Sequence, residues 1–126
     1  MASLDRPTDT QGPLIAAGQV SGTNVYNPSG EKLGSVYDVI LDKASGKAQY
    51  AVMSFGGFLG IGDSYFPLPW RTLTYDMDMG GYVVDIDRTQ LEGAPSYSGD
   101  DTSMWRNPDY GRRVDDYYAR FPTSMS

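Results

Sequence analysis

The sequence predicts an all-β protein, built as a small, strongly bent antiparallel β-barrel with a flexible N-terminal arm and a C-terminal helical tail. Between residues 20 and 87, short runs of β-branched and aromatic residues are separated by turn residues about every ten positions, which is typical of small barrels and sandwiches. No helix of standard length fits before residue 88. Both ends of the chain hold few core-forming residues, so the folded body is expected in the centre.

The N-terminal arm is expected over residues 1–17. Pro7 and Gly12 stand among small and polar residues there, and Leu14 and Ile15 are the one adjacent apolar pair. Because such a segment has little apolar surface to bury, it is expected to be flexible. The barrel itself is expected over residues 18–93.

The first half of the barrel is expected to contain three strands, over residues 23–26, 33–42 and 48–55. The segment from Asn27 to Gly30 has the Pro, Ser and Gly of a tight turn. Residues 42–47 form a polar hairpin loop with Gly46 near its end. In the second and third strands apolar residues occupy both odd and even positions, and therefore both faces of the strand. This leaves two explanations open: both faces are covered, or a β-bulge bends the strand.

The second half of the barrel is expected to contain three more strands, over residues 65–68, 72–77 and 82–86. The dipeptide Pro69-Trp70 separates the first two, and Gly80-Gly81 separates the last two. The last run alternates apolar and acidic residues, so one of its faces is expected in the core and the other in water.

The tail is expected to form a linker over residues 94–106, an amphipathic helix over residues 107–121 and a disordered end over residues 122–126. Asn107 is a suitable N-cap, with Pro108 and the acidic Asp109 in the first turn. Apolar residues then recur at helical spacing, at Tyr110, Val114, Tyr117, Tyr118 and Phe121. Pro122 ends this pattern.

Composition excludes several classes of function. The chain has 126 residues, no Cys and no His, which excludes thiol nucleophiles, imidazole bases and metal or haem sites built on those side chains. We therefore expect a protein that is not an enzyme and holds no cofactor or metal. The formal net charge of -6 repels phosphate backbones, so no nucleic-acid partner is expected. No apolar run is long enough to span a bilayer, and we expect a cytoplasmic protein.

Two groups of residues could bind a phosphate or a metal ion, or could have a purely structural role. The glycine-rich run over residues 56–63 lacks the Lys-Ser or Lys-Thr of a phosphate-binding loop, and Asp63 would repel an anion. Four carboxylates that could bind calcium or relay protons flank the Gly80-Gly81 turn: Asp76, Asp78, Asp85 and Asp87. Their spacing is irregular, so the solvated face of a hairpin is the favoured explanation.

Candidate contacts with a partner lie on the glycine-rich loop and in the tail. On the loop they are Phe58, Leu59 and Ile61, and in the tail they are Trp105, Tyr110, Tyr117, Tyr118 and Phe121. A helix of this length is marginal in water when isolated, so the aromatic rings of the tail must dock on a surface. The sequence leaves open whether that surface is the protein's own barrel or another chain.

An ordered series of motifs resembles the PRC-barrel family: Val25-Tyr26-Asn27, Gly30, Lys32-Leu33-Gly34-Ser35-Val36-Tyr37-Asp38-Val39-Ile40-Leu41-Asp42, Gly46, Tyr50-Ala51-Val52 and Pro67-Leu68-Pro69-Trp70. The chain looks like the stand-alone bacterial members, in which one barrel carries short tails. The resemblance implies a small bent barrel that works by binding and brings no catalytic residues with it.

Three functions remain as expectations at this point. The leading one is a non-catalytic protein-interaction or scaffold module that binds a protein partner or a second copy of itself. The resemblance also implies an accessory of photosynthetic electron and proton transfer, like the cytoplasmic domain of the reaction-centre H subunit, with peripheral association with a membrane complex. The third is an adaptor in maturation of the small ribosomal subunit.

Overall fold

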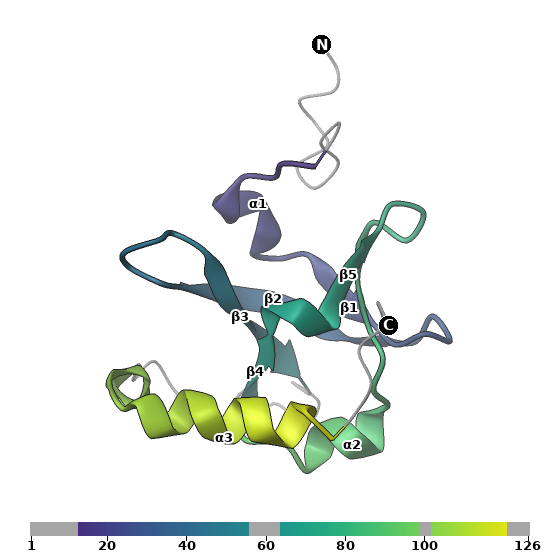
Figure 1. Ribbon diagram of the computed structural model, residues 1–126. Helices are drawn as coiled ribbons and strands as arrows, with labels where there is room; N and C mark the ends of the chain where they lie inside the picture. Colours follow the sequence, from purple (N-terminus) through teal and green to yellow (C-terminus); the bar gives the residue numbers. More distant parts are fainter. Residues whose placement is uncertain (1–12, 56–63, 99–101, 121–126) are drawn as a thin grey trace.

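A curled six-stranded sheet forms the body of the protein, and two helices lie beneath it (Figure 1). The computed structural model describes residues 13–55, 64–98 and 102–120. The strands are β1 (Asn24–Tyr26), β2 (Lys32–Leu41), β3 (Ala48–Phe55), β4 (Ser64–Pro69), β5 (Leu73–Asp76) and β6 (Gly81–Val84). The helices are α1 (Ala17–Val20), α2 (Arg88–Glu92) and α3 (Pro108–Tyr118), with 3-10 turns η3 (Trp70–Thr72) and η4 (Ser103–Arg106).

The spatial order of the strands makes the sheet an open, curled half-barrel. The order is β4-β3-β2-β1-β6-β5, so β4 and β5 are the two edges. The predicted barrel strands are therefore present, and they are gathered in one sheet. Among the described residues, no helix is both long enough and apolar enough to cross a membrane.

The expectation of a purely antiparallel sheet is wrong, because β1 and β6 pair in parallel. Val25 lies opposite Tyr82, and Tyr26 lies opposite Val83. The cause is the short turn η3, which joins β4 to β5 at the opposite edge of the sheet without forming a hairpin between them. The β5–β6 hairpin then returns with β6 running in the same direction as β1. The remaining strand pairs are antiparallel.

Bulges explain the mixed apolar pattern of β2. The register between β2 and β3 shifts between Val36 and Asp38, and again between Ile40 and Leu41. At the first shift Tyr37 of β2 has no opposite residue, so the side chains that follow it change face, and Val39 packs against the core as the buried Val36 does. At the second shift the extra residue is Gln49 of β3. Of the two explanations that the sequence left open, the bend at a bulge applies to β2.

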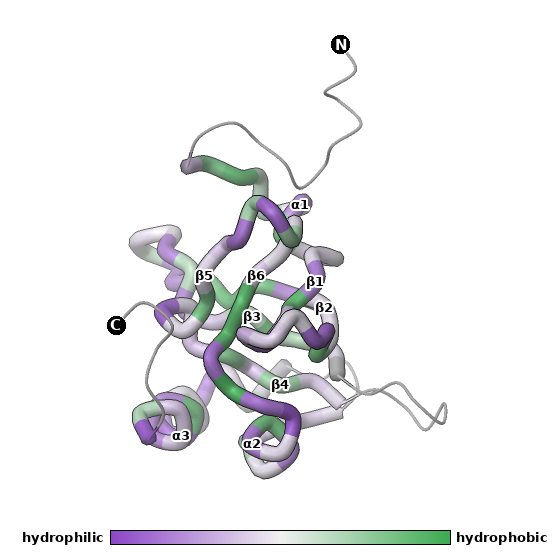
Figure 2. Tube along the Cα trace, turned by 90° about the vertical axis from the view of Figure 1, so that its right-hand side faces the viewer, coloured by the Kyte–Doolittle hydropathy of each residue, from purple (hydrophilic) through white to green (hydrophobic). Residues whose placement is uncertain are grey.

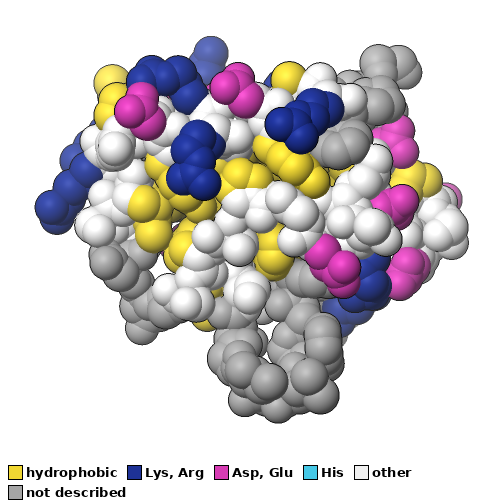
Figure 3. Space-filling model, turned by 90° about the horizontal axis from the view of Figure 1, so that it is seen from below, with side chains coloured by type: hydrophobic (Ala, Val, Ile, Leu, Met, Phe, Trp, Pro, Cys, Tyr) yellow, Lys and Arg dark blue, Asp and Glu magenta, His cyan; other side chains and the backbone are white. Residues whose placement is uncertain are grey.

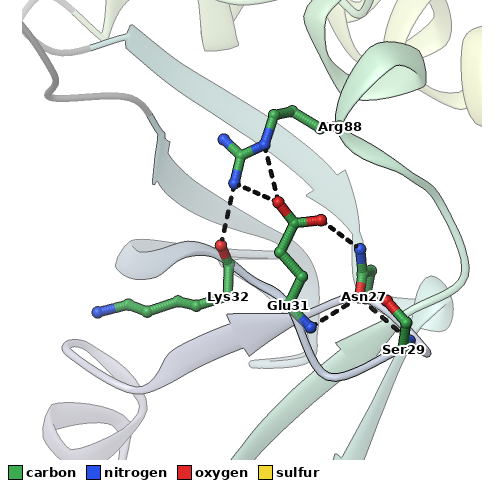
Figure 4. A network of polar contacts seen from close by, with 5 residues as sticks. All are labelled: Asn27, Ser29, Glu31, Lys32 and Arg88. Carbon is green, nitrogen blue, oxygen red and sulfur yellow. Dashed lines mark hydrogen bonds and ion pairs between the residues drawn. The ribbon is translucent and has the colours of Figure 1, made fainter.

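The turn between β1 and β2 is held by the side chain of Asn27. Its Oδ1 accepts hydrogen bonds from the Ser29 N–H at 3.1 Å and the Glu31 N–H at 2.9 Å, and the backbone closes as the Gly30 N–H donates to the Asn27 carbonyl at 2.9 Å. Gly30 has a φ of 91°, a conformation that favours glycine. Figure 4 shows how this turn is tied to α2: Arg88 donates to the Glu31 carboxylate from two nitrogens, at 2.9 and 3.1 Å.

Helices α2 and α3 lie side by side below the sheet (Figure 2). Helix α3 begins at the predicted N-cap, where Asn107 Oδ1 accepts a hydrogen bond from the Asp109 N–H at 2.9 Å. One face of α3 joins the core through Tyr110, Val114 and Tyr118. The segment ahead of α3 also has structure, since the backbone of Tyr97 pairs with Tyr65 at the edge of β4.

Candidate functional site

Two adjoining hollows run along one side of α3, where the tail meets the strands β2 and β3. The first has a volume of about 740 Å³ and the second about 560 Å³. Gln49, Tyr50 and Asp115 line both hollows. We call the two hollows together the tail groove. Its walls include Val39, Leu41, Trp105, Pro108 and Gly111 in the first hollow, and Pro69, Trp70, Arg71, Asp116 and Ala119 in the second.

A ridge formed by Tyr50 and Asp115 divides the tail groove. The Tyr50 hydroxyl donates to the Asp115 carboxylate at 3.2 Å and approaches the Gly111 carbonyl at 3.3 Å. Burial raises the pKa of Tyr50 to about 12, and the nearby charge of Asp115 raises it in the same direction. The hydroxyl therefore remains protonated near neutral pH and continues to donate a hydrogen bond that crosses from strand β3 to helix α3.

Gly111 permits this close approach of the helix to Tyr50. A Cβ atom at position 111 would lie 2.9 Å from the Tyr50 hydroxyl oxygen, closer than such atoms pack. Glycine in a helix interior costs about 1 kcal/mol relative to alanine. The glycine is nevertheless suited to this position, because it allows α3 to lie in contact with Tyr50 of β3.

A layer of aromatic rings fastens the tail to the sheet beside the groove. The ring of Trp105 lies 5.0 Å from that of Tyr50 and 5.0 Å from that of Tyr110, and Tyr110 also meets Tyr97 at 6.4 Å. Tyr110 and Tyr118 are buried, and their hydroxyls have no hydrogen-bond partner among the described residues. Burial raises the pKa of both. The rings therefore pack as apolar groups.

The face that carries α2 and α3 is partly apolar. Figure 3 shows hydrophobic side chains in a band across this underside, bordered by Lys and Arg side chains and by Asp and Glu side chains. Apolar side chains are therefore accessible on this side of the molecule, between its charged groups.

Comparison with protein families shows that residues 13–91 match the PRC-barrel domain. The chain belongs to the PRC-barrel family. The match includes all six strands and most of α2, whereas η4 and α3 lie beyond it. The tail groove therefore forms where the PRC barrel meets a tail outside the matched domain.

Among solved structures, the PRC-barrel protein is similar to RimM, a 16S ribosomal RNA processing protein from Pseudomonas aeruginosa. The sequences are 22% identical and the TM-score is 0.40. The match covers 63% of this chain and 48% of that one, so this chain spans about half the length of RimM. No curated protein sequence matches this chain significantly.

The structure packs the described aromatic candidates against the protein's own barrel. Tyr110 and Tyr118 are buried in the core, and Trp105 and Tyr117 are partly buried against it. The Tyr117 hydroxyl donates to the carbonyl of Gln90, the central residue of α2. Of these four, Trp105 lines the tail groove. The other candidates, Phe58, Leu59, Ile61 and Phe121, lie outside the described residues.

The four carboxylates near the Gly80-Gly81 turn have structural roles or face solvent. Asp76 Oδ1 accepts from the backbone N–H groups of Asp78 at 2.9 Å and Met79 at 3.1 Å. Asp87 caps α2 by accepting from the Gln90 N–H at 2.8 Å. Asp85 is exposed. Within the described ranges, no group of three Asp, Glu, His or Cys residues is placed to hold a metal ion.

Sequence reasoning missed most of the tail groove, namely Tyr50, Trp70, Gly111 and Asp115. Tyr50 and Trp70 belong to motifs of the family resemblance, so they were read as parts of the barrel. The signal that could have led to the groove is Gly111, since a glycine inside a helical pattern often marks a close approach of another element. Its partner in that approach is 61 positions earlier in the chain, and the sequence alone does not identify it.

Proposed function

We propose that this PRC-barrel protein is a non-catalytic interaction module that binds a protein partner in the tail groove. The observation that carries the proposal is that both tryptophans of the chain, Trp70 and Trp105, line this groove and are partly buried. Tryptophan is among the residues that contribute most to binding at protein interfaces, because its ring offers a large apolar area.

The chemistry of the groove supports binding rather than catalysis. Tyr50 and Asp115 are the titratable pair at its centre, and the high pKa of Tyr50, about 12, makes its hydroxyl a poor acid or base near neutral pH. The sequence contains neither His nor Cys to supply another base or nucleophile. The acidic net charge of -6 supports a protein partner over a nucleic acid.

Affinity capture from an extract of the native cell tests this proposal with four forms of the full chain. The wild type is compared with Gln49→Trp and Gly111→Ala, which alter the tail groove, and with Asp85→Asn as an exposed control outside it. We expect a captured partner that both groove variants lose and the control retains. The same partners in all four samples would contradict the proposal.

The same experiment discriminates among the narrower roles that the family resemblance implies. Proteins of the small ribosomal subunit in the captured fraction would support the maturation adaptor. Components of a photosynthetic membrane complex would support the reaction-centre accessory. A second copy of this chain, detected by sedimentation of the purified protein, would support self-association.

A further inference from the structure

We infer that the tail groove binds a proline-rich segment of the partner in the polyproline II conformation, next to an arginine or lysine. The inference rests on the proposed function and specifies its ligand. It follows from comparing the recurring ways in which proteins bind peptides with what the walls of this groove offer.

Addition of a peptide as an extra strand does not fit this groove. That mode needs a strand with free backbone N–H and C=O groups at the edge of a sheet. Of the strands that line the groove, β2 and β3 each have a hydrogen-bonded neighbour on both sides. The edge strand β4 contributes Pro69 alone, which has no backbone N–H to donate to an added strand. Recognition in the groove must therefore come from side chains.

An amphipathic helix does not fit either. A helix with its side chains is roughly 10–12 Å wide and lays a continuous apolar stripe into a continuous groove. The Tyr50–Asp115 ridge interrupts the tail groove and places a carboxylate where that stripe would lie. Two separate hollows with a common wall match a ligand that inserts side chains at intervals.

Polyproline II is such a ligand, and the walls of the groove suit it. Prolines on one face of this helix repeat every third residue, roughly 9 Å apart, and they dock in grooves lined by aromatic rings. Trp105 lies in the first hollow, Trp70 lies in the second, and Tyr50 separates them. Helix α3 has 11 residues, a length of roughly 16 Å, which a polyproline II segment of about six residues matches.

The charges of the groove favour a partner that carries an arginine or lysine next to its prolines. Three acids line it: Asp38, Asp115 and Asp116. The guanidinium of Arg112 is already paired with Asp109, and the cations that remain among the lining residues are Lys43 and Arg71. Together with the net charge of -6, this balance favours a partner with a positive side chain.

Fluorescence titration of the full-length protein tests the inference directly. The probe is a synthetic peptide of about eight prolines followed by one arginine, roughly 25 Å long as polyproline II. Both tryptophans line the groove, so the whole intrinsic tryptophan emission reports on it. We expect a saturable change in emission with a dissociation constant between micromolar and millimolar.

Matched peptides and variants separate the two parts of the ligand. A glycine-serine peptide of equal length and charge is expected to bind at least tenfold more weakly, because it loses the preformed helix. Asp115→Asn is expected to weaken the arginine-bearing peptide by about two- to fivefold, and Asp85→Asn is expected to leave it unchanged. Gly111→Ala is expected to weaken oligoproline with or without arginine, since the new Cβ displaces the Tyr50 ring.

Three results would overturn the inference: no saturable change at millimolar peptide, equal affinity for the glycine-serine peptide, or tighter binding of an amphipathic helical peptide of the same charge. None of them contradicts the proposed function by itself. That proposal stands or falls with the captured partner, and its loss from the groove variants without any oligoproline binding would show that the inference alone is wrong.

Discussion

Tyr118 illustrates how single residues attach the tail to the barrel. Its side chain is 1% exposed and is the largest of the fully buried side chains of the described residues. Burial of a ring of this size stabilises the docked tail through apolar area and close packing. Its hydroxyl opposes that gain, because it is buried without a hydrogen-bond partner among the described residues. The ring rather than the hydroxyl therefore holds α3 in place.

Replacing Tyr118 by phenylalanine tests this division. Tyr118→Phe is expected to leave the free energy of unfolding unchanged or to raise it by up to ~1 kcal/mol, because a desolvated hydroxyl without a partner is removed. Tyr118→Ala is expected to lower it by about 3–5 kcal/mol, the usual cost of deleting a buried aromatic ring. Urea denaturation measures both. A loss above ~1 kcal/mol in the phenylalanine variant would show that the hydroxyl makes a stabilising hydrogen bond.

The ridge of the tail groove gives a second prediction at the scale of residues. Burial is the main cause of the high pKa of Tyr50, and the charge of Asp115 is the next. Asp115→Asn is therefore expected to lower the pKa of Tyr50 from about 12 without returning it to the ordinary tyrosine value of 10.0. NMR titration of the tyrosine ring carbons measures the change. Asp116→Asn serves as the control, and an equal effect in both variants would argue against the Tyr50–Asp115 contact.

At the scale of elements, the tail depends on the start of its helix. Helix α3 is capped by Asn107 and has Pro108 and Asp109 in its first turn, so its local sequence favours helix at this point. The preceding turn η4 follows Thr102, whose side chain makes no cap hydrogen bond. Asn107 and Thr102 therefore allow a comparison, in the same segment, between a side chain that caps a helix and one that does not.

Removal of the α3 cap is expected to lower the stability of the whole protein. Asn107→Ala is expected to lower the free energy of unfolding by about 1 kcal/mol, since a helix N–H loses its acceptor. Thr102→Ala, the control, is expected to change it by less than ~0.5 kcal/mol. Chemical denaturation followed by circular dichroism compares the two. Equal losses would show that the Asn107 side chain does not act as a cap.

The elements were predictable from the sequence to different degrees. Turn residues such as Asn27 and Gly30 act locally, and the strands and the N-cap of α3 follow from local patterns, so their existence could be predicted. The parallel pairing of β1 and β6 could not, because it depends on η3 carrying the chain from one edge of the sheet to the other. The tail groove joins Tyr50 to Asp115 across 65 positions, and periodicity within one segment contains no information about such a contact.

At the scale of the whole molecule, the tail and the barrel share one hydrophobic core. Val114 of α3 and Leu91 of α2 are fully buried in the same cluster as Val25, Leu68 and Val84 of the sheet. Docking of the tail and folding of the barrel are therefore expected to be a single cooperative transition. A change that weakens the tail interface should lower the stability of the entire described structure.

Alkaline pH is expected to lower the stability of the molecule through its buried tyrosines. Burial raises the pKa of Tyr82, Tyr97, Tyr110 and Tyr118, and that of Tyr50 rises to about 12. These groups hold their protons in the folded protein after the unfolded chain has begun to lose them near pH ~10. Their contribution to stability is thus fully present below pH ~10 and is lost as the pH rises toward ~12.

Urea denaturation at pH values between about 9 and 11 measures this loss. The comparison of wild type with Tyr118→Phe isolates one tyrosine from the lysines and arginines that also titrate at alkaline pH. We expect the free energy of unfolding to fall less steeply with pH in the variant. Identical slopes would mean that Tyr118 titrates alike in the folded and unfolded states.

The central claim is that the groove between tail and barrel is the surface by which this PRC-barrel protein binds a partner. Site-specific photo-crosslinking in the native cell tests it most directly, with a photoreactive residue at Gln49, which is exposed and lines both hollows, or at the exposed control position Asp85. The account predicts a discrete covalent adduct with one protein from position 49 and none with that protein from position 85. Adducts of equal yield from both positions, or none from position 49, would contradict it.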